Sequence, residues 1–246
     1  MRRCLTALFV VGLVSINTRD AAAQVSAKDL AAYAALNSTP IGALTPIMVS
    51  PGTKGEKSFN SFAGRFSHFS PSGGGDGTNN LGATFYHQAG MNAAVSGTVG
   101  YMKPSCPAGA TCDGVLMVGG DVHSTLWNNA AAKSNTDMSL NLQGSLGYGH
   151  QKDVNAASLA IGVPLAISFE QASKSRIGLF VTPGFGWGRI SASGGGASGS
   201  ESGTRPLVGA GANWMSPSGW GLHLSYQAVV IENGGNNVGL GFSWKM

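Results

Sequence analysis

A two-residue alternation of apolar with small or polar residues runs from Phe59 to the C-terminus. Successive side chains of a β-strand point to opposite faces, so this period predicts strands that each carry one apolar face. In the last segment, Leu240 and Phe242 alternate with Gly241 and Ser243. The predicted strands are 59–68, 81–88, 93–101, 115–126, 140–148, 159–169, 177–187, 206–215, 220–230 and 238–246.

The chain is poor in charge for a protein that keeps a water-exposed surface. Charged residues make up 11% of it, against about 25% in an average soluble domain. No segment after the first two dozen residues approaches the roughly 20 apolar residues of a membrane-spanning helix. A closed barrel is the other structure that satisfies every backbone polar group in lipid. We therefore predict an all-β fold, an antiparallel up-and-down transmembrane β-barrel of about ten strands over 58–246, with eight as the alternative count.

The first 23 residues have the features of an export signal. Arg2 and Arg3 precede a short apolar run over 5–14, and Ala21-Ala22-Ala23 provides the small residues of a cleavage site. We expect a signal peptide over 1–23. The formal net charge of +4, part of which lies in this segment, does not indicate a nucleic-acid partner.

Residues 24–57 differ from the rest of the chain. Ser26 and Asp29 resemble a capping box, and three prolines follow, at Pro40, Pro46 and Pro51. We expect a short periplasmic helix followed by a Pro-rich linker. A plug folded into the barrel is the alternative.

Cys106 and Cys112 are the two cysteines that remain after removal of the signal segment. An even pair at close spacing in an exported chain favours a disulfide in a surface loop over a metal site. We expect no metal and no cofactor.

Aromatic residues and connection lengths indicate how such a barrel would lie in a membrane. Tyr and Trp collect at membrane–water interfaces. The long connections, at 70–80, 102–113 and 189–204, all fall on one side if both termini are periplasmic. The connection 127–137 is the exception, because it is long for a turn on the opposite side. The aromatic residues at predicted strand ends are Tyr101, Trp127, Tyr148, Trp187, Trp214, Trp220 and Trp244.

The C-terminal strand resembles the assembly signal of bacterial outer-membrane β-barrel proteins, in which a polar residue, a glycine, a hydrophobic residue and an aromatic residue recur at fixed spacing. Asn237, Gly239, Phe242 and Trp244 match it in register, although Lys245 and Met246 follow where the family pattern ends. The resemblance identifies no subfamily. It implies a bacterial outer-membrane location, with outer-membrane lipid and the barrel-assembly machinery as partners.

Strand parity directs a small set of ionisable residues into the barrel. Asp121 and His123 are two apart and so share a face. They form either a catalytic or selectivity pair, or part of an interior network with Arg65 or Arg176, and the network is the favoured interpretation. The inward candidates are Arg65, Asp121, His123, Glu170, Arg176, Arg205 and His223.

Three functions are consistent with these features. The leading prediction is a non-enzymatic barrel, either a narrow porin-like channel for a small solute or a structural and surface-contact protein. The second is a barrel enzyme acting on envelope lipids or peptides, for which His68-Phe69-Ser70 resembles the histidine-any-serine element of outer-membrane lipid A deacylases. The third is a soluble secreted β-protein, which leaves the scarcity of surface charge unexplained.

Overall fold

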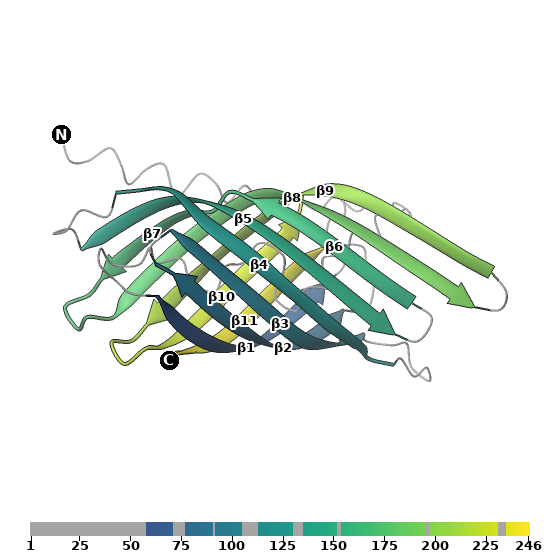
Figure 1. The fold of residues 1–246 in the computed structure, drawn as a ribbon, viewed down its shortest axis with the longest axis horizontal. Coiled ribbons are helices and arrows are strands. Elements are labelled where there is room, and N and C mark those ends of the chain that lie inside the picture. Colours follow the sequence, from purple (N-terminus) through teal and green to yellow (C-terminus); the bar gives the residue numbers. More distant parts are fainter. Residues whose placement is uncertain are drawn as a thin grey trace.

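Antiparallel strands wrap into a closed, tilted barrel in the computed structural model (Figure 1). The structure describes residues 58–70, 77–90, 92–104, 113–129, 135–151, 154–194, 197–230 and 235–246. The strand segments are β1 (Phe59–Ser70), β2 (Thr78–Ala89), β3 (Ala93–Pro104), β4 (Val115–Asn128), β5 (Thr136–Gln151), β6 (Val154–Gly162), β7 (Leu165–Glu170), β8 (Arg176–Gly194), β9 (Ala197–Met215), β10 (Trp220–Val229) and β11 (Asn236–Lys245).

β6 and β7 together occupy one strand position of the barrel. Both pair with β5 on one side and with β8 on the other. The interruption falls at Val163 and Pro164, and proline cannot donate a ladder hydrogen bond. Its carbonyl still accepts from the Asn141 amide at 2.9 Å, and the Val163 amide donates to the Pro183 carbonyl at 3.0 Å. The barrel therefore has ten strands, as the alternation predicts.

The first and last strands close the barrel. β1 pairs with β11 from Ser61 opposite Lys245 to Ser70 opposite Asn236, and β4 pairs with β5. From Arg65, the directly paired residues can be followed around the wall in either direction until they reach β5. One route arrives at Gly149 and the other at Asp137, and these two residues are twelve positions apart on β5. A stagger of this kind accompanies strands tilted by about 35–45° from the barrel axis.

The two faces of the wall have opposite character, as the period of two predicts. Inward side chains such as Thr84 and Ser243 have an exposed fraction of 0%, whereas outward Leu240 is 59% exposed. A soluble protein buries its apolar side chains instead, so this arrangement fits a barrel surrounded by lipid. Other exposed apolar side chains on the outer face are Phe62, Phe66, Leu81, Phe85, Val99, Leu146, Leu159, Ile161, Phe185, Leu222, Leu224 and Phe242.

Aromatic side chains lie near both ends of the apolar outer face. At the end that holds the C-terminus, the Trp214 and Trp220 rings meet edge to face with centroids 4.6 Å apart, and Trp220 stacks on Phe242 at 6.2 Å. Toward the other end lie Tyr101, Tyr148 and Trp187 on β3, β5 and β8. This placement of Tyr and Trp is typical of interfacial aromatic belts.

Two connections differ from the sequence expectation. The loop predicted over 189–204 was wrong, because β8 continues to Gly194 and β9 begins at Ala197. These stretches carry mainly serines on the outward face and mainly Ala and Gly on the inward face, so they show no apolar alternation. The connection predicted over 127–137 is shorter than expected, because β4 extends to Asn128 and β5 begins at Thr136.

The export signal over 1–23, the helix and linker over 24–57 and the Cys106–Cys112 pair lie outside the described residues. The part of the chain that the structure describes holds no helix of the length and apolarity needed to cross a bilayer.

We expect an arginine on the outer face to destabilise the barrel according to its depth. Leu240 lies midway along β11, whereas Leu116 pairs with Tyr101 and His150 near the end of β4. Leu240→Arg should lower the free energy of unfolding by about 2–4 kcal/mol and Leu116→Arg by about 0–1 kcal/mol. Urea titration of vesicle-folded protein, followed by gel mobility of unboiled samples, measures both. Equal losses would contradict the placement of Leu240 against lipid.

Candidate functional site

The candidate site is the polar interior of the barrel, and Arg65 lies near its middle. Arg65 comes from β1 and is 5% exposed, and its guanidinium interacts electrostatically with the Asp121 carboxylate of β4. The Ser96 hydroxyl on β3 donates a hydrogen bond to the same carboxylate. The structure therefore joins two of the predicted ionisable residues, Arg65 and Asp121, across the interior.

A glycine on the neighbouring strand makes room for this arginine. A Cβ atom at Gly241 would lie 3.0 Å from Arg65 Cγ and 3.3 Å from Arg65 Nε. Any side chain at position 241 would therefore press on the arginine stem. Replacement of Gly241 would push the guanidinium away from its present position.

Short polar side chains line much of the rest of the interior, beside larger buried ones such as Tyr86, Met117 and Phe180. The polar ones bond to one another across adjacent strands. Thr84 and Thr98 hydroxyls lie 2.9 Å apart, and the Asn80 amide donates to the Ser67 hydroxyl at 3.2 Å. Opposed residues on neighbouring strands are within reach of each other, so such pairs follow from the register. These contacts join neighbouring strands through their inward side chains.

His223 on β10 lies between two hydrogen-bond partners. Its Nδ1 is 2.9 Å from Asn213 Oδ1 on β9, and its Nε2 is 2.7 Å from Ser243 Oγ on β11. Because an amide oxygen can only accept, Nδ1 carries a proton, and the neutral ring then accepts from the Ser243 hydroxyl. This order of serine, histidine and asparagine has the geometry of an activated nucleophile.

The surroundings of this trio do not support catalysis. Ser243 has an exposed fraction of 0%, so a substrate cannot reach its hydroxyl. β11 pairs on both sides, with β1 and with β10, so its backbone amides are committed to the ladders. An oxyanion needs donors that are free to receive it. We therefore assign the trio a structural role in the interior network.

Several interior polar atoms have no protein partner. Nine buried side-chain N or O atoms among the described residues lack a hydrogen bond, and His123 Nε2 is one of them. Buried polar groups without protein partners usually bind water. The others are Ser61 Oγ, Asn80 Oδ1, Gln143 Oε1, Ser168 Oγ, Thr182 Oγ1, Asn213 Nδ2, Gln227 Oε1 and Asn237 Oδ1.

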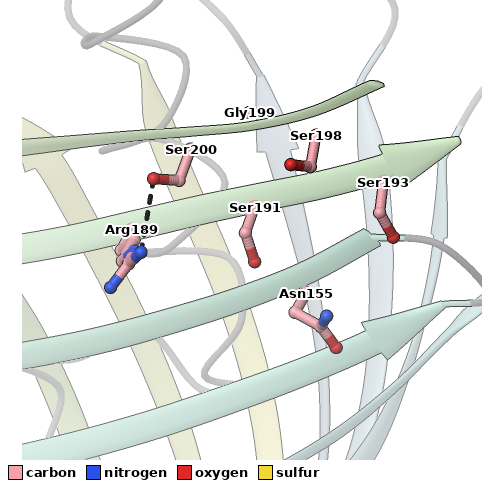
Figure 2. A pocket seen from close by; sticks show the side chains of 7 residues that line it. All are labelled: Asn155, Arg189, Ser191, Ser193, Ser198, Gly199 and Ser200. Carbon is pink, nitrogen blue, oxygen red and sulfur yellow. Dashed lines mark hydrogen bonds between the residues drawn. The ribbon is translucent and has the colours of Figure 1, made fainter. Parts of the chain in front are cut away.

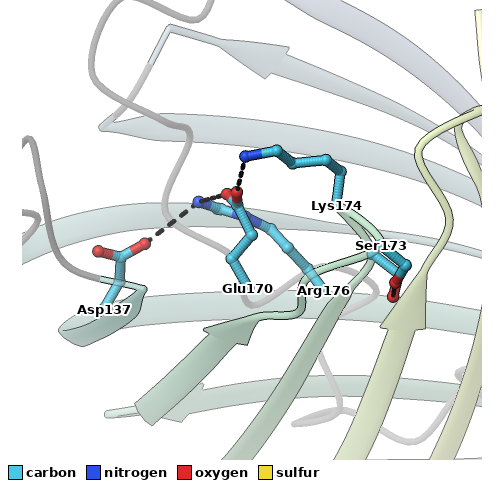
Figure 3. A network of polar contacts seen from close by, with 6 residues as sticks. Asp137, Glu170, Ser173, Lys174 and Arg176 are labelled. Carbon is cyan, nitrogen blue, oxygen red and sulfur yellow. Dashed lines mark hydrogen bonds and ion pairs between the residues drawn. The ribbon is translucent and has the colours of Figure 1, made fainter.

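Glu170 and Arg176 belong to a second cluster at the end of the barrel that holds the C-terminus. Arg176 Nη2 lies 3.3 Å from Asp137 Oδ2 and 3.6 Å from Glu170 Oε2, and Lys174 Nζ lies 3.0 Å from Glu170 Oε1 (Figure 3). Arg205 is separate from it and donates from Nη1 to the Thr204 carbonyl at 2.9 Å. The predicted ionisable residues thus divide between mid-barrel and the two ends.

The His68-Phe69-Ser70 element does not form a site of the expected kind. His68 faces outward, and its Nδ1 is 2.8 Å from Asn79 Oδ1. Phe69 points into the barrel with an exposed fraction of 7%. Among the described residues, no group of three or more His, Cys, Asp and Glu lies close enough to hold a metal ion.

The partners of His223 were not found by sequence reasoning. Asn213 and Ser243 are common polar residues on strands of their own, and the sequence carries no motif that marks them. Only the register, which places Asn213 directly opposite His223, could reveal the contact. The four residues of the proposed assembly signal all lie on β11, with Asn237 buried inward and Phe242 and Trp244 exposed outward.

We expect removal of the buried partner of His223 to destabilise the barrel. Asn213→Ala leaves His223 Nδ1 without its acceptor in a buried setting, which costs about 1–3 kcal/mol. The same pair of atoms occurs at an exposed position, in Asn79 and His68, so Asn79→Ala is the matched control and should cost less than about 0.5 kcal/mol. Unfolding in denaturant compares the two. Similar losses would mean that burial of the pair has no effect.

Comparison with known proteins identifies the family. The model of the outer membrane protein beta-barrel domain matches residues 9–245. Similar solved structures include Ail of Yersinia pestis, 12% identical over 77% of this chain and 97% of that chain with a TM-score of 0.34. The N-terminal barrel of Pseudomonas aeruginosa OprF is 10% identical over 77% and 100%, with a TM-score of 0.37. No curated relative matches the sequence. The chain therefore belongs to the outer membrane protein beta-barrel family, which places it in the bacterial outer membrane.

Proposed function

We propose that this protein is a narrow channel for small polar solutes, with Arg65 and Asp121 at its constriction. The observation that carries the proposal is the set of nine buried interior polar atoms without a protein partner. A barrel built only as a rigid support would satisfy these groups or replace them with apolar ones, because each unsatisfied buried group costs about 1–3 kcal/mol. A hydrated interior supplies their partners.

The size of the barrel is consistent with this role. Eight strands leave an interior that side chains just fill, and ten strands leave slightly more. Many of the inward residues are Ser, Thr, Asn and Gln, which add less bulk than aromatic side chains. Larger inward side chains, such as Tyr86, Met117 and Phe180, narrow the interior further, and the long Arg65 side chain reaches from β1 toward Asp121 on β4. These two charged side chains together narrow the passage more than a hydroxyl can.

The charges along the interior favour weak ion selectivity. Arg65 and Asp121 balance each other at mid-barrel. At the mouth, Arg176 and Lys174 oppose Asp137 and Glu170. Rings of one sign of charge give selective pores. Balanced pairs favour passage of small neutral or zwitterionic solutes.

We expect removal of the Arg65 and Asp121 side chains to widen the channel. Arg65→Ala/Asp121→Ala removes both charges together, so no unpaired charge remains buried. Single-channel conductance in planar bilayers should rise at least twofold over the unmodified protein. Lys103→Ala, an exposed position on β3, is the control and should leave conductance unchanged. Absence of any conductance in all three proteins would refute the channel and leave a closed structural barrel.

We further propose that the chain is exported with removal of residues 1–23, and that the assembly machinery recognises Phe242 and Trp244 on β11. In the exported protein, Cys106 and Cys112 would meet an oxidising compartment.

We expect these two cysteines to form a disulfide there. Mass spectrometry of the unreduced, folded protein should find the peptide that contains both cysteines lighter by two hydrogens than after reduction. Alkylation of both thiols in the folded protein would contradict the disulfide.

A further inference from the structure

The outer face of the barrel changes from apolar to polar along β8, directly after Trp187. Phe185 and Trp187 are exposed outward, and the next residues of the same face are Arg189, Ser191 and Ser193. β8 continues for seven residues past Trp187, and β9 accompanies it throughout. In Figure 1 this hairpin extends farther than the neighbouring strands. The change therefore occurs on a rigid paired ladder.

A polar hollow lies on this outward face. It has a volume of about 320 Å³ and spans β6, β8 and β9. Figure 2 shows the side chains that line it converging from the three strands. They are Asn155, Arg189, Ser191, Ser193, Ser198 and Ser200.

The hollow presents hydrogen-bond donors and one positive charge. Arg189 Nη2 lies 3.3 Å from the Ser200 hydroxyl, which is neutral. The ion pairs among the described residues do not include Arg189, so its charge is not neutralised within the described part of the barrel. An arginine with several donors in a plane suits a phosphate group.

Asn155 is held so that its amide nitrogen remains available. Its Oδ1 accepts from the Tyr148 hydroxyl and lies within hydrogen-bond distance of His150 Nδ1, each at 2.7 Å. These contacts use the oxygen and fix the orientation of the amide. The Nδ2 group can then donate into the hollow, beside the serine hydroxyls. Amide and hydroxyl groups of this kind bind the hydroxyls of a sugar.

The depth of the hollow identifies its occupant. Trp187 and Tyr148 belong to the aromatic belt, which lies at the level of lipid headgroups. Arg189 is two residues beyond Trp187, about 7 Å along the strand. An outward-facing group at this depth meets the headgroup of a neighbouring lipid. The hairpin lies at the end opposite the C-terminus, which is the outer surface if the termini are periplasmic.

We propose that this hollow binds the phosphorylated sugar headgroup of an outer-leaflet glycolipid. Arg189 contacts the phosphate, and Asn155 with the serine hydroxyls of β8 and β9 contacts the sugar. The site is separate from the channel, since it faces away from the lumen. Binding there would fix the position of the β8–β9 hairpin relative to the surrounding leaflet.

Native mass spectrometry of the detergent-solubilised full-length protein tests the proposal. The probes are diphosphorylated lipid A, its dephosphorylated form, phosphatidylglycerol and inorganic phosphate. The unmodified protein should retain diphosphorylated lipid A at least tenfold more tightly than phosphatidylglycerol or the dephosphorylated form. Arg189→Gln should lose that tenfold preference, and Ser191→Ala/Ser200→Ala should weaken it.

The matched control is Arg205→Gln, which removes an arginine from the inward face of β9 and should bind as the unmodified protein does. Unchanged binding by Arg189→Gln would overturn the site. Equal retention of phosphatidylglycerol would show a general anion effect. Full competition by inorganic phosphate at equal concentration would show a site for free phosphate. Either result would overturn the proposal that the hollow binds a glycolipid. Conductance of Arg189→Gln should stay unchanged, so failure here is distinguishable from failure of the channel.

Discussion

Hydrogen bonding between β1 and β11 converts a sheet with two open edges into a barrel. An open edge would expose a row of unpaired N–H and C=O groups, which lipid cannot satisfy. The pairing runs from Ser61 and Lys245 to Ser70 and Asn236, almost the full length of both strands. Every other feature depends on this closure, because only a closed wall has a distinct inside and outside.

The closed wall separates two environments, and its stagger decides which interior side chains meet. Arg65 and Asp121 are far apart in sequence and on strands that do not pair, yet they interact across the interior. His223 likewise receives one partner from each neighbouring strand, Asn213 and Ser243. The arrangement of Asn213, His223 and Ser243 resembles that of a catalytic trio. The same arrangement buries the three residues away from any substrate, so their role is structural.

On the outside, the change of side-chain character at Trp187 marks where lipid tails give way to headgroups. On the side of Trp187 toward the middle of the barrel, the outer face contacts lipid tails and can be apolar without cost. Beyond Trp187, toward the tip of the hairpin, the outer face needs polar side chains. The β8–β9 hairpin meets that requirement with serines and Arg189 rather than with an irregular loop. Its regular backbone is what allows these side chains to form one hollow.

The amino-acid sequence by itself determined most of the strands and their inward and outward faces, because a period of two is a local property of the chain. That β11 closes the barrel against β1 came from the tertiary structure. Prediction from the sequence failed at 189–204, where the outward face carries mainly serines and the inward face mainly small residues, so no apolar alternation exists to be read. It also placed Arg65, Asp121 and His223 inside. It offered Arg65 and Arg176 as alternative partners of Asp121 without deciding between them, and it gave no partner for His223. Only the tertiary structure decided that, because contacts across a barrel depend on register and stagger, which arise when all ten strands pair at once.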